Sequence, residues 1–155
     1  MNRLQGKVAI VTGAAGGFGE GIARLFVAEG AKLLIADLDG DKAQQVAASL
    51  GAQARSVRCD VSNRADIDAA LKACVDAFGA PDIVVNNAGT THRNQSMLDV
   101  DEATFDRVFA VNVKSIYHMT QAVVPLMKAR KSGCIVNIGS TAGIRPRPGL
   151  SKAAP

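Results

Sequence analysis

Five short apolar runs, separated by longer amphipathic stretches, constrain the fold of this 155-residue chain more than any other feature. The runs are rich in Val, Ile and Leu and end near Gly, Asn or Asp, as strands buried on both faces do. Strands that alternate with helices predict repeated βαβ units and a parallel sheet with helices on both faces. Because such crossovers are right-handed, we expect an α/β fold with a doubly wound, Rossmann-like sheet in the order 3-2-1-4-5.

The expected ends of the strands and helices are placed from glycines that end helices, from helix-capping residues and from changes in the spacing of the apolar residues. The expected strands span residues 7–13, 32–37, 54–61, 81–89 and 133–140. The expected helices span residues 17–29, 41–50, 63–79 and 101–130, the last with a break near Asn112 and a local kink at Pro125. No linker, internal repeat or low-complexity segment interrupts this pattern, so residues 1–155 are interpreted as a single domain.

The composition excludes several classes of protein. Hydrophobic residues make up 48% of the chain and charged residues 21%, which is typical of a soluble globular protein. No run approaches the roughly 18 apolar residues that a membrane span needs, so we expect no membrane partner. The first residues do not form a signal peptide, and a cytoplasmic location is therefore expected.

The cysteines and histidines do not indicate a metal site. Cys59, Cys74 and Cys134 are scattered, with neither metal-ligand spacing nor a disulfide pattern, and there are only two histidines. Each cysteine lies in an apolar context, so all three are interpreted as small buried hydrophobic residues. We expect no bound metal.

The charges are distributed unevenly along the chain. All 14 acidic residues precede residue 107, whereas 8 of the 18 basic residues lie at 107–155. A basic segment can indicate nucleic acid. Here the positive residues are spread over an apolar helix pattern and a Pro-rich loop without interleaved aromatic residues, so we expect no nucleic-acid partner. The acidic partners of this segment are instead expected in sequence that is not present.

A glycine-rich turn, "TGAAGGFG" at residues 12–19, joins the first strand to the first helix. The pyrophosphate of a dinucleotide needs close approach of the backbone and free N–H groups at a helix N-terminus. Gly13 suits the tight turn, and Gly17 and Gly19 remove side chains that would block the approach. Taken alone, the pattern is weak evidence, because a tight strand-to-helix turn without a ligand is the alternative.

Asp37 ends the second strand, 18 residues after Gly19. A carboxylate there can accept both hydrogen bonds from the adenosine ribose and would repel a 2′-phosphate. Because "IADLDG" and the glycine-rich turn contain no Arg or Lys beside it, NAD is favoured over NADP as the cofactor. The alternative is a solvated acid at the end of a strand.

These motifs, with four others in order, give the chain a resemblance to the short-chain dehydrogenase/reductase family over essentially its whole length. The others are "CDV" (59–61), which resembles the family's adenine-contacting segment, "NNAG" (86–89), which resembles its fourth-strand motif, and the pair "VNV" and "IVNIGS", which resemble its active-site helix and strand. The resemblance implies a dinucleotide-binding domain whose cofactor-binding positions are Gly13, Gly17, Phe18, Gly19, Asp37, Asp60, Val61, Asn87, Ala88 and Gly89.

The resemblance implies NAD-dependent hydride transfer between nicotinamide and a secondary alcohol or ketone, with 3-oxoacyl compounds, sugars or similar small carbonyl compounds as substrates. In this family a Ser and a Tyr hydrogen-bond the substrate oxygen, and the Tyr is the general acid/base. A Lys four residues later lowers the pKa of the Tyr, and an Asn holds a water linked to that Lys. The resemblance assigns the first role to Ser140 and the last to Asn112.

After Ser140 the sequence departs from the family pattern. Pro148 stands four residues before Lys152, and residues 141–155 contain no Tyr. Tyr117 is interpreted as a core residue, and Lys152 is the candidate for the family's lysine because "SKAA" resembles its usual surroundings. Two interpretations remain open: a dehydrogenase, or an NAD-binding fragment or pseudoenzyme that lacks the general acid/base.

The family's later strands and helices are also expected to be absent from this chain. One face of the fifth strand and of the long helix should then lie open. If the full family fold is present, the resemblance implies a homo-oligomer.

Overall fold

The computed structural model describes residues 2–140 and contains one parallel sheet. Its strands follow the order β3-β2-β1-β4-β5, as predicted, and all four pairings are parallel. The strands are β1 (Val8–Thr12), β2 (Lys32–Asp37), β3 (Ala54–Arg58), β4 (Ile83–Asn86) and β5 (Cys134–Asn137). The order reverses between β2 and β4 around β1, which opens a crevice at the carboxyl edge of the sheet.

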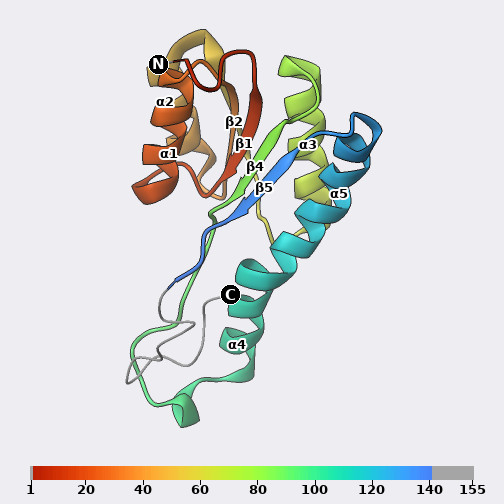
Figure 1. Ribbon diagram of the computed structural model, residues 1–155. Helices are drawn as coiled ribbons and strands as arrows, with labels where there is room; N and C mark the ends of the chain where they lie inside the picture. The colour runs from red at the N-terminus through yellow and green to blue at the C-terminus, as the bar shows by residue number, and fades with distance from the viewer. Residues whose placement is uncertain (1, 141–155) are drawn as a thin grey trace.

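Helices cover both faces of the sheet (Figure 1). One layer contains α1 (Gly17–Ala28) and α2 (Gly40–Leu50), and the other contains α3 (Arg64–Phe78) and α5 (Ser115–Ala129). The remaining elements are α4 (Glu102–Phe109), the π-helical segment η3 (Ala110–Lys114) and two short 3₁₀ turns, η1 (Gly51–Gln53) and η2 (Met97–Asp99). Within residues 2–140, no helix has the length and hydropathy to cross a membrane.

Two apolar layers form the core, one on each side of the sheet. Ile10 and Leu34 face the α3 and α5 layer together with Ile67 and Val123. Ala9, Val11 and Leu33 are among the residues in the other layer, which packs against α1 and α2. Successive residues of β1 therefore enter opposite layers, and all five are buried. This double burial explains why the strands appear in the sequence as continuous apolar runs.

The last strand is the exposed edge of the sheet. Within the described residues β5 pairs only with β4, and three of its four residues are exposed. The expected open face of the fifth strand is therefore observed. Cys134 is exposed, which corrects its interpretation as a buried residue, whereas Cys59 and Cys74 are buried as expected. The error arose because an apolar sequence context does not reveal whether another element covers the strand.

The predicted long helix is not broken near Asn112. The backbone widens there into the π-helical segment η3, which links α4 to α5, and α5 runs on through Pro125. A single π turn admits an extra residue without ending the helix, and such turns are frequent at functional sites. Tyr117, interpreted as core, is 59% exposed on this helix, which corrects that interpretation.

Candidate nucleotide-binding site

A cavity of about 700 Å³ lies at the carboxyl edge of the sheet. It is lined by the glycine-rich turn after β1, the start of α2 after β2, the turn after β3, the segment after β4, and two residues from α4 and η3. The lining residues are Gly13, Ala15, Gly16, Phe18, Gly19, Asp37, Leu38, Asp39, Lys42, Cys59, Asp60, Val61, Ser62, Asn87, Ala88, Gly89, Thr90, Arg107 and Val111. Nine of the ten predicted cofactor-binding residues are thus brought together. Gly17 is the exception.

The glycine-rich turn is packed against the segment after β4. Gly13 has a φ of +63°, and a Cβ on it would come 2.7 Å from the Cα of Ala88. A Cβ on Gly19 would come 2.2 Å from the carbonyl oxygen of Gly13 and 2.5 Å from Nδ2 of Asn87. Gly19 therefore permits packing within the protein, in addition to any approach of a ligand. Gly17 has a φ of +56° at the first residue of α1, where glycine relieves backbone strain.

Thr12 and Asn87 join β1 to β4 beneath this turn. The backbone N–H groups of Asn87 and Ala88 donate to Oγ1 of Thr12 over 3.1 and 3.0 Å. In return, Nδ2 of Asn87 donates to the carbonyl oxygens of Thr12 and Gly13, each over 2.9 Å. The sequence analysis missed Thr12. Its position directly before the first glycine of the turn is the signal that would have identified it.

Asp37 lines the cavity and also hydrogen-bonds the backbone of the glycine-rich turn. Its Oδ2 accepts a hydrogen bond of 2.8 Å from the backbone N–H of Ala15, and its Oδ1 accepts one of 2.9 Å from that of Asp39. A carboxylate offers about four acceptor sites, so two bonds leave capacity for a ligand's hydroxyls. Asp37 thus fits a ribose, and it also positions the turn that would meet the pyrophosphate.

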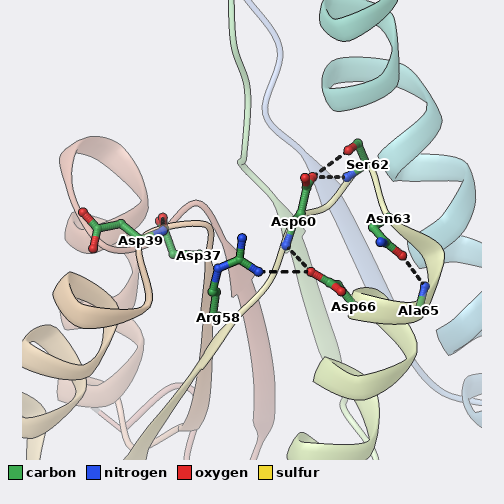
Figure 2. A network of polar contacts seen from close by, with 8 residues as sticks. All are labelled: Asp37, Asp39, Arg58, Asp60, Ser62, Asn63, Ala65 and Asp66. Carbon is green, nitrogen blue, oxygen red and sulfur yellow. Dashed lines mark hydrogen bonds and ion pairs between the residues drawn. The ribbon is translucent and has the colours of Figure 1, made fainter.

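The turn after β3 is ordered by carboxylates (Figure 2). Oδ1 of Asp60 accepts hydrogen bonds from the N–H and the hydroxyl of Ser62, over 2.9 and 2.6 Å. The N–H of Asp60 donates to Oδ2 of Asp66 over 2.9 Å, and Arg58 lies 3.7 Å from the same oxygen. Val61 is buried at this turn and lines the cavity. The sequence analysis did not identify Ser62, Asp66 or Arg58 as part of the site.

Two cations lie near Asp37, although its own sequence segment has none. Arg58 is its register partner on β3, and Lys42 lines the cavity from the first turn of α2. Nζ of Lys42 lies 3.0 Å from Oδ2 of Asp39, and Oδ1 of Asp39 accepts the backbone N–H of Lys42 over 3.1 Å. Hydrogen bonds from the Lys42 backbone and side chain lower the pKa of Asp39, and the bond to Asp39 raises the pKa of Lys42.

Asn112 lies in η3 and is buried against the segment after β4. Its Oδ1 accepts from the N–H of Thr90 and its Nδ2 donates to the Thr90 carbonyl, each over 2.8 Å. Arg107 donates to the Thr90 hydroxyl over 3.0 Å. The structure therefore gives Asn112 a positioning role at the cavity wall, and the predicted role in holding a water remains a prediction.

Ser140 follows β5 at the same edge of the sheet. Pairing of this segment with β4 continues past the strand, since the N–H of Ile138 donates to the carbonyl of Asn86 over 2.9 Å. The side chains of Asn86 and Asn137 are also joined, over 2.8 Å. Ser140 is exposed and does not line the cavity. Lys152 lies outside the described residues, so the three predicted catalytic residues are not seen together.

The chain is similar to known oxidoreductases over most of its length. A family model described as short chain dehydrogenase matches residues 7–152. The chain is 48% identical over 151 residues to a 4-formylbenzenesulfonate dehydrogenase of Comamonas testosteroni, covering 96% of this chain and 60% of that protein. It is 44% identical over 144 residues to a galactitol 2-dehydrogenase of Agrobacterium fabrum, covering 92% of this chain and 56% of that one.

A solved structure agrees with these sequence matches. The crystal structure of a 3-ketoacyl-(acyl-carrier-protein) reductase from Brucella melitensis, complexed with NADH, superposes with a TM-score of 0.93 at 44% identity. The match covers 97% of this chain and 64% of the reductase. The chain thus spans about 60% of the length of the curated relatives it matches.

Proposed function

The chain belongs to the short-chain dehydrogenase family, and from that membership we propose that it is an NAD-dependent oxidoreductase acting between a secondary alcohol and a ketone. The observation that carries the proposal is the cavity at the carboxyl edge of the sheet, where the glycine-rich turn, Asp37 and the turn at Asp60 meet. This is the edge at which open parallel sheets bind nucleotides, at the point where the strand order reverses.

The residues around the cavity fit a dinucleotide. Gly16 lines the cavity and a Cβ on it would meet no protein atom within 4 Å, so the absence of a side chain leaves room for a pyrophosphate. The N-terminus of α1 supplies N–H groups and the positive end of the helix dipole. In this proposal Asp37 accepts the ribose hydroxyls, while Asp60 and Val61 bound the adenine.

The choice of NAD over NADP rests on the acids near the ribose position. Asp37 and Asp39 both line the cavity there, and their two negative charges oppose a 2′-phosphate. The NADH-bound reductase that this chain resembles supports a nicotinamide cofactor, and the preference for its non-phosphorylated form is our proposal.

The proposed chemistry requires a proton as well as a hydride. A nicotinamide bound in the cavity would supply the hydride to a carbonyl carbon, and the carbonyl oxygen would need a proton to become a hydroxyl. Ser140 would donate a hydrogen bond to that oxygen, and Asn112 would hold the water that leads to Lys152. Residues 141–155 contain no Tyr, so a chain with only these residues after Ser140 is expected to turn over about 10²- to 10⁴-fold more slowly than one that carries the family's Tyr.

The proposed substrates are small carbonyl compounds or secondary alcohols. The names of the relatives given above refer to 4-formylbenzenesulfonate, galactitol and 3-ketoacyl-(acyl-carrier-protein) as substrates. That range supports the substrate class without selecting one member. A chain that binds NAD without turnover is the alternative, and its only support is that residues 141–155 contain no Tyr.

Titration of the purified chain with NADH separates these possibilities. The intact mass of the purified chain is measured first and compared with the mass of the 155-residue sequence, because additional residues could supply catalytic groups. We expect saturable NADH binding with NADPH weaker by about tenfold or more, since two like charges about 4 Å apart repel by roughly 1–4 kcal/mol and about 1.4 kcal/mol is tenfold in affinity. NADH oxidation is then followed with a panel of ketones and aldehydes. No NADH binding would overturn the proposal, whereas binding without turnover would favour the alternative.

We also propose that the protein forms a homodimer through its long helix. Phe105, Phe109, Val113 and Tyr117 recur every fourth residue along α4, η3 and α5 and are 41%, 42%, 46% and 59% exposed. The rings of Phe105 and Phe109 lie in contact, with their centroids 4.5 Å apart and their planes tilted by 33°. An apolar stripe on one helix can pair with its own copy about a two-fold axis, so a second copy of this chain is the proposed occupant.

A further inference from the structure

Asp60, which lines the cavity, is held through its main chain and through one oxygen of its side chain. Its N–H donates to Oδ2 of Asp66 over 2.9 Å, and its carbonyl oxygen accepts from the N–H of Asn63 over 2.9 Å. Oδ1 of its carboxylate accepts from the N–H and the hydroxyl of Ser62. Within residues 2–140 the other carboxylate oxygen, Oδ2, accepts no hydrogen bond, so it keeps its capacity to accept one from a ligand.

The bond between Asp60 and Asp66 joins the turn after β3 to the first turn of α3. The N–H of Cys59 still pairs with β2, donating to the carbonyl oxygen of Asp37 over 2.7 Å. For the next N–H, that of Asp60, the partner is the Asp66 carboxylate instead of a backbone carbonyl. Asp66 therefore holds the chain at the point where it leaves the sheet and begins to line the cavity.

The carboxylate of Asp66 is not used to cap α3. The N-cap of this helix is Asn63, whose Oδ1 accepts the N–H of Ala65 over 2.8 Å. In a capping box, the acidic side chain three residues after the N-cap bonds back to the N–H of the N-cap residue. Here the N–H of Asn63 donates to the Asp60 carbonyl, and the carboxylate of Asp66 reaches past it to the N–H of Asp60. The carboxylate thus orders the turn at the cavity.

Arg58 adds little to this placement. Its Nη1 lies 3.7 Å from Oδ2 of Asp66, and its side chain is 64% exposed (Figure 2). An ion pair that is open to solvent contributes little to stability, because water and salt screen it. The same oxygen of Asp66 is closer to the N–H of Asp60, at 2.9 Å. The hydrogen bond is therefore the contact that fixes the turn.

Resting on the proposed function, we propose that Asp66 is a positioning residue for the adenine end of the cofactor. By holding the N–H of Asp60 it fixes the Asp60 carboxylate, whose Oδ2 accepts the 6-amino group of adenine. Asp66 does not line the cavity itself, so it acts through Asp60. A carboxylate fixed in this way favours a base that donates a hydrogen bond at that position over one that accepts there.

The probes are NADH and reduced nicotinamide hypoxanthine dinucleotide, which differ only in the base. Hypoxanthine carries a carbonyl oxygen where adenine carries the amino group, so an acceptor would face the Asp60 carboxylate. We expect the wild-type chain to bind NADH about tenfold more tightly, the scale of one hydrogen bond to a charged group. The fluorescence of the dihydronicotinamide measures both affinities.

Asp66→Ala removes the partner of the Asp60 N–H. We expect it to weaken NADH binding by about 3- to 10-fold and binding of the hypoxanthine analogue by less than about twofold, so that most of the preference is lost. Asp66→Asn keeps a side-chain oxygen that can accept the same bond, and it should retain the preference. Asp66→Ser, whose oxygen is one bond closer to the main chain, serves if Asp66→Ala does not fold.

Asp68→Ala is the matched control. It removes the same charge from α3, but Asp68 pairs with Arg64 at an exposed position and does not line the cavity. Both dinucleotides should therefore bind this variant as they bind wild type.

The outcomes separate this inference from the proposed function. If the wild-type chain binds neither dinucleotide, the nucleotide site itself is wrong and this inference falls with it. If it binds both equally, the site stands, but the adenine contact at Asp60 and the role of Asp66 are rejected. A preference that survives in Asp66→Ala, or an equal loss of affinity for both dinucleotides, rejects the role of Asp66 alone. An equal loss of preference in Asp68→Ala would mean that the charge of α3 sets it instead of the bond to Asp60.

Discussion

The amide of Asn112 pairs with the backbone of Thr90 as a neighbouring strand would. Oδ1 of Asn112 accepts the Thr90 N–H and Nδ2 donates to the Thr90 carbonyl, both over 2.8 Å, although the residues are 22 positions apart. Asn112 is only 7% exposed and lies in the π-helical segment η3. The widened turn thus places a buried amide where it holds the segment that leaves β4 and lines the cavity.

Replacing Asn112 by Ala should destabilise the protein. The substitution leaves a backbone N–H and a carbonyl of Thr90 without these partners, which costs about 1–3 kcal/mol when the groups stay shielded from water. The free energy of unfolding in urea measures the loss. Asn94→Ala, at an exposed position, should change it by less than about 0.5 kcal/mol. Equal effects of the two substitutions would show that the Asn112 contacts do not matter.

Gly19→Ala should abolish nucleotide binding, whereas Gly21→Ala in the same helix should not. A Cβ at position 19 would overlap the Gly13 carbonyl at 2.2 Å and force the turn apart. A Cβ at position 21 meets no atom within 4 Å, so that substitution should stabilise α1 by about 0.5–1 kcal/mol. NADH titration and thermal melts compare the two variants. Unimpaired NADH binding by folded Gly19→Ala would contradict the close packing of this turn.

One of the three cysteines should react readily in the native state. Burial raises the pKa of both the Cys59 and the Cys74 thiols to about 12, so neither forms much thiolate near pH 8, whereas Cys134 is exposed on β5. Ellman's reagent should therefore titrate about one thiol in buffer and three in denaturant. Cys134→Ser should remove the fast phase. A fast phase that persists in that variant would place the reactive thiol elsewhere.

The stability contributed by Glu29 should depend on pH in a defined direction. Hydrogen bonds from the side chain and backbone of Arg3, of 2.9 and 3.0 Å, lower the pKa of Glu29 in the folded protein. A lowered pKa stabilises the fold above the unfolded value of about 4.3, and this stabilisation is lost as the pH falls through the folded pKa.

Glu29→Gln is the variant that tests this dependence. Wild type should melt at a higher temperature than Glu29→Gln at pH 7, and the two midpoints should converge below about pH 4. Glu20→Gln removes a carboxylate that is paired with Arg24 on the more exposed surface of α1, and it should have a smaller effect at pH 7. A gap between wild type and Glu29→Gln that does not change with pH would reject the ion pair as its cause.

Charges on the long helix should dissociate the proposed dimer. Val113→Glu with Tyr117→Glu places two carboxylates on the exposed apolar stripe, where a two-fold axis would bring four together. Sedimentation velocity should show a dimer for wild type and a monomer for this variant. Leu98→Glu, at a 95% exposed residue outside the stripe, should remain dimeric. A monomeric wild type would refute the dimer.

Most of the fold could be predicted because its signals are local. A strand buried on both faces must be apolar throughout, so β1 and β2 were evident from their residues, and right-handed crossovers then implied the strand order. The predicted strands 54–61, 81–89 and 133–140 each end three residues beyond β3, β4 and β5. After β3 and β4, these extra residues belong to turns that line the cavity. The turn at 12–19 was likewise identified from its glycines alone.

The sequence by itself therefore determined the sheet, its order and the edge at which a nucleotide could bind. Only the tertiary structure brought Lys42 and Arg58 to Asp37, paired Asn112 with Thr90, and left Cys134 and Tyr117 exposed. The physical reason is the separation along the chain of the residues that take part in each interaction. Periodicity and turn chemistry act between neighbours in the chain, whereas charge pairing and coverage of a surface depend on residues that only the folded sheet brings together.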